Sequence, residues 1–156
     1  MLKFNNTAMS FESVAKSNLR ENNMGERSDL QKYIVKSWDL FRNELGMPSL
    51  ELIGQEITPD DSTQNRLDLL AYDSEDYFLA VIELKRGRDK LQLLQAISYA
   101  AMISNWGEEK IIKRINNWDE EKKIKQININ GTLEKEELIE IVRENETNPN
   151  IKIILI

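Results

Sequence analysis

The sequence predicts an α/β (α+β) fold. Its mixed sheet has central meander strands and is flanked by helices. Three short runs between residues 50 and 85 are rich in aliphatic and aromatic side chains. The turns between these runs are too short to hold crossover helices, so the strands are expected to be antiparallel. Helical patterns of apolar residues precede and follow the three strands.

The chain has 156 residues, which is the length of a single domain. Residues 1–25 are polar and Asn-rich, and we interpret them as an N-terminal arm or short helix. The domain proper then occupies residues 26–156. Because the chain ends within an apolar run, this domain could be excised from a longer protein.

The first helix of the domain begins at one of two candidate capping boxes. These are Asn23 with Glu26 and Ser28 with Gln31. The helix is predicted to end near Gly46, because glycine commonly follows the last turn. Five residues at helical spacing form its predicted buried stripe: Leu30, Tyr33, Ile34, Trp38 and Phe41.

The three meander strands are predicted at residues 50–57, 66–72 and 77–85, with a tight turn from Asp73 to Asp76 between the last two. Three helices are then expected, over 89–104, 108–118 and 133–145, and a final apolar strand over 151–156.

The composition excludes several kinds of site. The chain has neither histidine nor cysteine, so it contains no Ser-His-Asp triad, cysteine nucleophile or Cys/His zinc site of its own. Catalysis would have to use carboxylates, lysines, hydroxyls and an oxygen-preferring metal such as Mg²⁺ or Mn²⁺. The net charge is −6, which disfavours binding of nucleic acid over the whole surface. Neither a signal peptide nor a membrane span is recognisable, so we expect a cytoplasmic protein.

The candidate chemistry centres on Glu83-Leu84-Lys85, at the end of the most strand-like run. In a strand, Glu83 and Lys85 project from one face while Leu84 points to the other. Asp68 lies in the preceding strand, and a hairpin about the 73–76 turn would bring it near the level of Glu83. Two neighbouring carboxylates repel each other and therefore favour a bound cation, with Lys85 as a fixed positive charge beside it.

Two helices add candidate residues to this site. Gln95 and Tyr99 share one face of the helix over 89–104, because they are four residues apart. On the first helix, the spacing of Glu26 to Leu30 and Tyr33 places this carboxylate on the buried stripe, facing the sheet.

This set of residues resembles the PD-(D/E)xK nuclease superfamily, and most closely its NucS-like and RecB-like endonuclease branch. The resemblance covers about residues 26–106 and is strongest over RLDLLAYDSEDYFLAVIELKRG. The matching positions are Glu26, Asp68, Glu83 with Lys85, and Gln95 with Tyr99. The superfamily's proline is missing, because Leu67 precedes Asp68. A literal Pro59-Asp60 occurs in a turn, where a metal ligand is less expected, and Asp29 is an alternative to Glu26.

The resemblance implies a restriction-endonuclease-like core that hydrolyses phosphodiester bonds in DNA, in repair or in defence against foreign DNA. Asp68, Glu83, Glu26 and the main-chain carbonyl of Leu84 would hold Mg²⁺ or Mn²⁺. Lys85 would assist the attacking water, and Gln95 would position the strand end or the substrate.

DNA contacts are expected from the basic run after the third strand and from two further side chains. The candidate residues are Arg66, Arg86, Arg88, Lys90 and Tyr99. This basic patch is modest, so an additional domain, a partner protein or a homodimer would complete strong binding. The alternative is a non-catalytic DNA-binding or protein-interaction module with a nuclease-like fold, which the acidic net charge favours.

Overall fold

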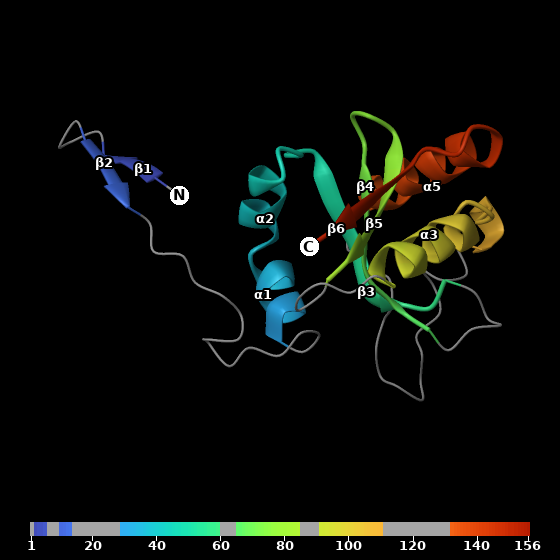
Figure 1. Ribbon diagram of the computed structural model, residues 1–156. Coiled ribbons are helices and arrows are strands. Elements are labelled where there is room, and N and C mark those ends of the chain that lie inside the picture. Colours follow the sequence, from blue (N-terminus) through green and yellow to red (C-terminus); the bar gives the residue numbers. More distant parts are fainter. Residues whose placement is uncertain (1, 6–9, 14–28, 60–64, 85–90, 111–131) are drawn as a thin grey trace.

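The computed structural model describes residues 2–5, 10–13, 29–59, 65–84, 91–110 and 132–156 (Figure 1). Its elements, in chain order, are β1 (Leu2–Asn5), β2 (Ser10–Ser13), α1 (Gln31–Lys36), α2 (Trp38–Glu44), β3 (Leu50–Ile57), β4 (Leu67–Asp73), β5 (Phe78–Glu83), α3 (Gln92–Ile103), α5 (Thr132–Thr147) and β6 (Ile151–Leu155).

A four-stranded mixed sheet forms the centre of the molecule, in the order β3-β4-β5-β6. The first three strands form the predicted antiparallel meander, and their bounds lie within two residues of the predicted ones. β6 returns along β5 in the parallel direction, so the chain crosses over between them through α3 and α5. The predicted mixed sheet flanked by helices is therefore confirmed.

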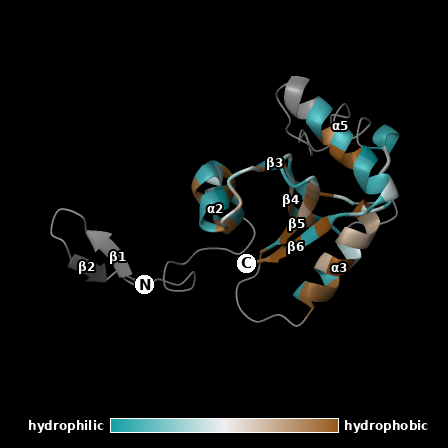
Figure 2. Ribbon diagram, turned by 90° about the horizontal axis from the view of Figure 1, so that it is seen from above, coloured by the Kyte–Doolittle hydropathy of each residue, from teal (hydrophilic) through white to brown (hydrophobic). Residues whose placement is uncertain are grey.

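Helices cover both faces of this sheet (Figure 2). On one face, α3 and α5 pack against a core cluster that includes Leu70, Tyr72, Val81, Tyr99 and Trp106. On the other face, α1 and α2 pack against a second cluster that includes Leu50, Leu69, Phe78 and Ile82. Because β4 and β5 are buried on both faces, their sequences are mostly apolar and do not alternate between apolar and polar residues.

The first predicted helix is two short helices, separated at Ser37, whose φ of −117° and ψ of 36° lie outside the helical region. The second segment is anchored to the sheet, because the indole Nε1 of Trp38 donates a 2.9 Å hydrogen bond to the Leu50 carbonyl. Gly46 follows α2 with a φ of +70°, a left-handed conformation that favours glycine, as its position predicted.

The predicted buried stripe of this helix was wrong in one residue. Tyr33 is 60% exposed, whereas Gln31 is only 4% exposed. Both candidate capping boxes include residues outside the described ones, Asn23 with Glu26 and Ser28, so they stay predictions, while the Gln31 side chain bonds to the sheet. The prediction that Glu26 faces the sheet rested on its helical spacing to Leu30 and Tyr33. The exposure of Tyr33 removes one of these two arguments.

The remaining helices follow the prediction in part. α3 and α5 occupy the ranges expected for them, whereas only residues 108–110 of the helix predicted over 108–118 are described, and they are helical. Of the N-terminal 25 residues, only Leu2–Asn5 and Ser10–Ser13 are described, and they pair as the antiparallel strands β1 and β2. Among the described residues, no helix has the length and apolar character that crossing a membrane requires.

Candidate functional site

Asp68 and Glu83 lie side by side on adjacent strands, as the hairpin predicted. Each carboxylate accepts a hydrogen bond from the main chain of the other strand. The Leu84 amide donates to Asp68 Oδ2 at 2.8 Å, and the Asp68 amide donates to Glu83 Oε1 at 3.3 Å. The two acidic residues are 0% and 1% exposed, so this is a buried carboxylate pair.

The register of the hairpin produces this juxtaposition. Leu69 pairs with Ile82, so the next step along both strands sets Asp68 against Glu83. Ile82 and Leu84 both belong to the core cluster beneath α1 and α2, so Glu83, which alternates with them, belongs to the face covered by α3. The alternation predicted for this strand end is therefore confirmed for the described residues.

Two glutamines hold the main chain at this pair from opposite faces of the sheet. From α1, Gln31 Nε2 donates to the Asp68 carbonyl at 3.0 Å. From α3, Gln92 Nε2 donates to the Glu83 carbonyl at 2.9 Å. The Glu83 carbonyl also accepts the Ile156 amide at 3.0 Å. These hydrogen bonds hold the main chain that carries both carboxylates in place. Neither Gln31 nor Gln92 was a predicted site residue.

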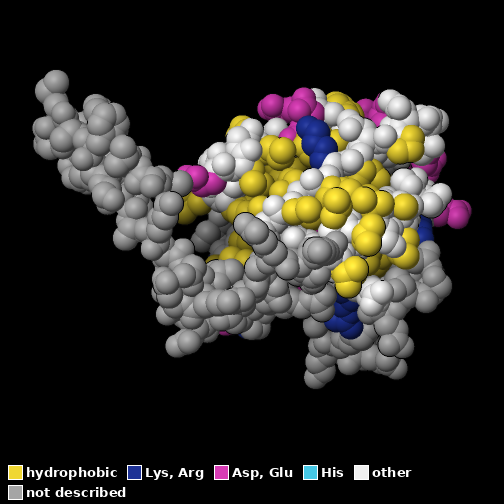
Figure 3. Space-filling model, viewed as in Figure 1, with side chains coloured by type: hydrophobic (Ala, Val, Ile, Leu, Met, Phe, Trp, Pro, Cys, Tyr) yellow, Lys and Arg dark blue, Asp and Glu magenta, His cyan; other side chains and the backbone are white. Residues whose placement is uncertain are grey.

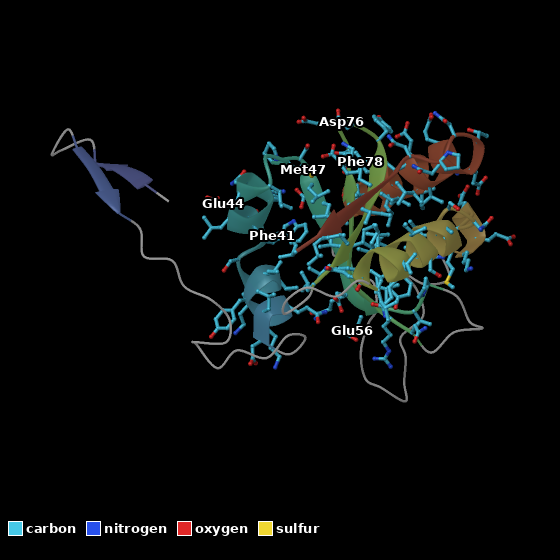
Figure 4. All side chains as sticks on the ribbon, in the orientation of Figure 1. Phe41, Glu44, Met47, Glu56, Asp76 and Phe78 are labelled. Carbon is cyan, nitrogen blue, oxygen red and sulfur yellow. The ribbon has the colours of Figure 1, made fainter. Side chains whose placement is uncertain are left out.

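A third acid lies on the neighbouring strand. Gln55 pairs with Leu69 and Ile57 pairs with Leu67, so Glu56 lies beside Asp68 along the row from β3 to β5. Figure 4 shows Glu56 at the end of the sheet opposite the β4–β5 turn, which carries Asp76. Its backbone φ of +52° is rare for a residue other than glycine. Sequence reasoning missed this residue, because an isolated Glu-Ile pair gives no signal for such a conformation.

Three other predicted residues lie elsewhere in the described structure. Gln95 is half-buried on α3, and its Oε1 is shielded from solvent without a hydrogen-bond donor among the described residues. It is Gln92, three residues earlier, that contacts Glu83. Tyr99 is 4% exposed and packs in the core beneath α3, so it supports the helix that carries Gln92. Arg66 is half-buried immediately before β4.

Several predicted site residues lie outside the described residues. They are Glu26, Lys85, Arg86, Arg88 and Lys90, and the alternative acid Asp60 lies there too. Their roles in metal or DNA binding stay predictions.

The donor set of the described pair fits a hard divalent cation. It offers carboxylate oxygens from two strands, next to the main chain of Leu84, and oxygen ligands are those that Mg²⁺ and Mn²⁺ prefer. Within the described ranges, acidic residues do not form a group of three close enough to hold a metal ion. Mg²⁺ commonly binds through one or two carboxylates and completes its shell with water and substrate phosphate oxygens. A pair of carboxylates is therefore sufficient for that mode.

Comparison of the chain with protein-family models, curated proteins and solved structures gave no match.

Proposed function

We propose that the chain is a metal-dependent nuclease domain that hydrolyses phosphodiester bonds in DNA with Mg²⁺ or Mn²⁺. The observation that carries this proposal is the reciprocal Asp68–Glu83 pair at the ends of two central strands. Burying two like charges together is costly, and a bound cation offsets that cost.

The topology also supports the proposal. The order of elements around the site is helix, three-strand meander, helix and a parallel strand, and this order is compatible with the restriction-endonuclease-like core that the resemblance implies. The α5 helix is an addition between α3 and β6. The pair of acids lies at adjacent strand ends.

The residues of this chain would act mainly by positioning. Asp68 and Glu83 would bind the cation, while the hydrogen bonds from Leu84, Gln31 and Gln92 keep both carboxylates and their strands in place. When bound, the metal supplies a water of lowered pKa and neutralises charge on the phosphate. Lys85, two residues after Glu83, would hold positive charge near the attacked phosphorus.

Cleavage of labelled DNA tests this proposal. Single-stranded, duplex and branched DNA are each incubated with the protein and Mg²⁺ or Mn²⁺. We expect metal-dependent cleavage that is lost in Glu83→Gln and Lys85→Ala. Glu75→Gln is the matched control, because Glu75 is an exposed acid in the β4–β5 turn at the other end of the sheet.

The outcomes separate an enzyme from a binding module. DNA binding without cleavage under any metal condition, in a folded protein whose melting temperature is unchanged by metal, would support the non-catalytic alternative. Cleavage that persists in Glu83→Gln would place the chemistry elsewhere in the chain.

The proposed partners follow from the same site. DNA is the proposed substrate, and a further domain, partner protein or second copy would supply the affinity that a chain of net charge −6 lacks.

A further inference from the structure

One side of the molecule exposes apolar side chains over both α3 and β6 (Figure 3). On these two elements the exposed large apolar residues are Leu93, Leu94, Ile97 and Leu155, which are 41–61% exposed. The twelve residues of α3 include no charged side chain, although 31% of the whole chain is charged. A solvent-facing helix normally carries charges on its outer face, so this flank has the composition of a contact surface.

The same side carries a strand edge, β6, to which no further strand is paired among the described residues. In the described sheet β6 pairs only with β5. Leu79 donates to the Asn150 carbonyl, and the Ile156 amide donates to Glu83. Alternation along the strand therefore directs the N–H and C=O groups of Ile151, Ile153 and Leu155 away from β5. Such an edge is a template for another strand.

The opposite edge of the sheet is protected against such pairing. β3 has an irregular register between Leu52 and Gly54 and a left-handed residue at Glu56. Bulges and charges interrupt edges in this way. β6, in contrast, is regular and carries a single charge, on Lys152, whose ammonium lies 3.8 Å from Asp76 and over the Phe78 ring of the same chain.

We propose that a second copy of this chain covers this surface, through antiparallel pairing of the two β6 strands about a two-fold axis at Ile153. This register joins Ile153 to its mate and Ile151 to the mate of Leu155. All three outward-facing residues of each copy then lie in hydrogen-bonded pairs. Lys152 faces Ile154 of the other copy rather than another lysine, so the charges are compatible with the pairing.

The same two-fold axis brings the two α3 helices together. α3 packs over both β5 and β6. Adjacent strands are about 4.8 Å apart, so a helix above the gap between β5 and β6 lies about 10 Å from its mate. Packed helices are typically 8–10 Å apart. A single two-fold rotation therefore covers both the β6 edge and the apolar flank of α3. An unrelated strand would cover only the edge, so a second copy is the better fit.

The position of the axis along α3 identifies the residue to test. Gln92 lies at the level of Glu83, which pairs with Leu155. Ile153 is two strand residues further back, about 7 Å, and that distance corresponds to about four or five helix residues. Ile97 therefore lies near the axis and faces its own mate.

The surface is small for a permanent dimer. A whole Leu or Ile side chain removes roughly 60–120 Å² of apolar surface, so the four exposed residues contribute roughly 120–240 Å² per copy. Standard interfaces bury about 800 Å² per partner. We therefore expect a weak, reversible dimer rather than a permanent one, in which the strand pairing supplies the remaining contact.

Sedimentation velocity of the 156-residue chain, from micromolar to several hundred micromolar, tests the proposal. The wild type should shift from monomer to dimer. Ile97→Glu and Ile97→Lys should each weaken the dimer about tenfold or more, and an equimolar mixture of the two should restore it. Ser98→Glu is the control, because Ser98 is exposed on the other flank of the same helix.

Leu155→Pro is a second variant, which removes an outward-facing N–H and leaves the pairing with β5 intact. It should also weaken the dimer, while circular dichroism shows each variant to be folded. A wild type that stays monomeric at all concentrations would overturn the proposal. A dimer that the Ile97 variants leave unchanged would place the interface elsewhere and overturn it equally. DNA cleavage plays no part in these readouts.

Discussion

Replacing Asp68 in two ways separates its role as a hydrogen-bond acceptor from its role as a charge. Asp68 Oδ2 accepts the amide of Leu84 at 2.8 Å, and both residues are buried. Asp68→Ala removes the acceptor, whereas Asp68→Asn keeps an oxygen at that position and removes only the charge. The two variants should therefore differ in stability without metal.

The structure sets the size of the difference. A hydrogen bond to a charged group contributes about 1.5–3 kcal/mol, and the buried Leu84 amide would lose it in Asp68→Ala. Removal of one carboxylate also relieves repulsion from Glu83, so the net loss should be smaller, about 1–2 kcal/mol. In Asp68→Asn the weaker neutral hydrogen bond and the relieved repulsion oppose each other. We expect its unfolding free energy to change by less than about 1 kcal/mol.

Urea unfolding in EDTA, followed by the fluorescence of the three tryptophans, measures both variants. At a typical slope of about 1–3 kcal/mol per molar urea, Asp68→Ala should lower the midpoint by about 1 M. At a Mg²⁺ concentration ten times its dissociation constant, the wild type should gain about 1.4 kcal/mol and neither variant should. Equal destabilisation of both variants in EDTA would refute the reasoning, because the charge itself would then be structural.

Three further predictions concern the rest of the fold. Tyr77 has a left-handed φ of +51°, so Tyr77→Gly should raise the unfolding free energy measured in urea by about 0.5–1 kcal/mol. A lower unfolding free energy would show that the left-handed backbone of Tyr77 is not strained. Trp106→Ala should cost about 3–5 kcal/mol, because the indole is 2% exposed and donates to the Pro59 carbonyl at 2.8 Å; a cost below about 1 kcal/mol would show that the site is loosely packed. Hydrogen bonds from Arg143 lower the pKa of Glu108, so their stabilisation is present above the usual pKa near 4.5 and is lost as pH falls through the lowered pKa. The stability difference between wild type and Arg143→Ala should therefore shrink on acidification, and a difference that stays constant with pH would contradict this assignment.

The strands and the acidic pair could be predicted because both depend on local rules. A period of two residues sets the faces of a strand, and a short turn fixes the register of a hairpin. These two rules place Asp68 and Glu83 at one level of the hairpin from the sequence alone. The pairing of β6 with β5 could not be predicted in the same way, because a long connection separates the two strands.

The glutamines at the site could not be recognised from the sequence. Gln31 was predicted only as part of a candidate capping box, and the helical spacing of apolar residues placed Tyr33 in the buried stripe. The structure buries Gln31 instead, since the amide finds an acceptor in the Asp68 carbonyl. A pattern of hydrophobic residues carries no information about such a polar contact between distant segments.

Titration of Mn²⁺ into the protein, followed by electron paramagnetic resonance, tests the central claim most directly. If Asp68 and Glu83 hold a divalent cation, the wild type and the Glu75→Gln control should bind Mn²⁺ with equal stoichiometry. Asp68→Asn and Glu83→Gln should lose that binding while remaining folded. Equal binding by all four proteins, or none by the wild type even with DNA present, would contradict the assignment of the metal site.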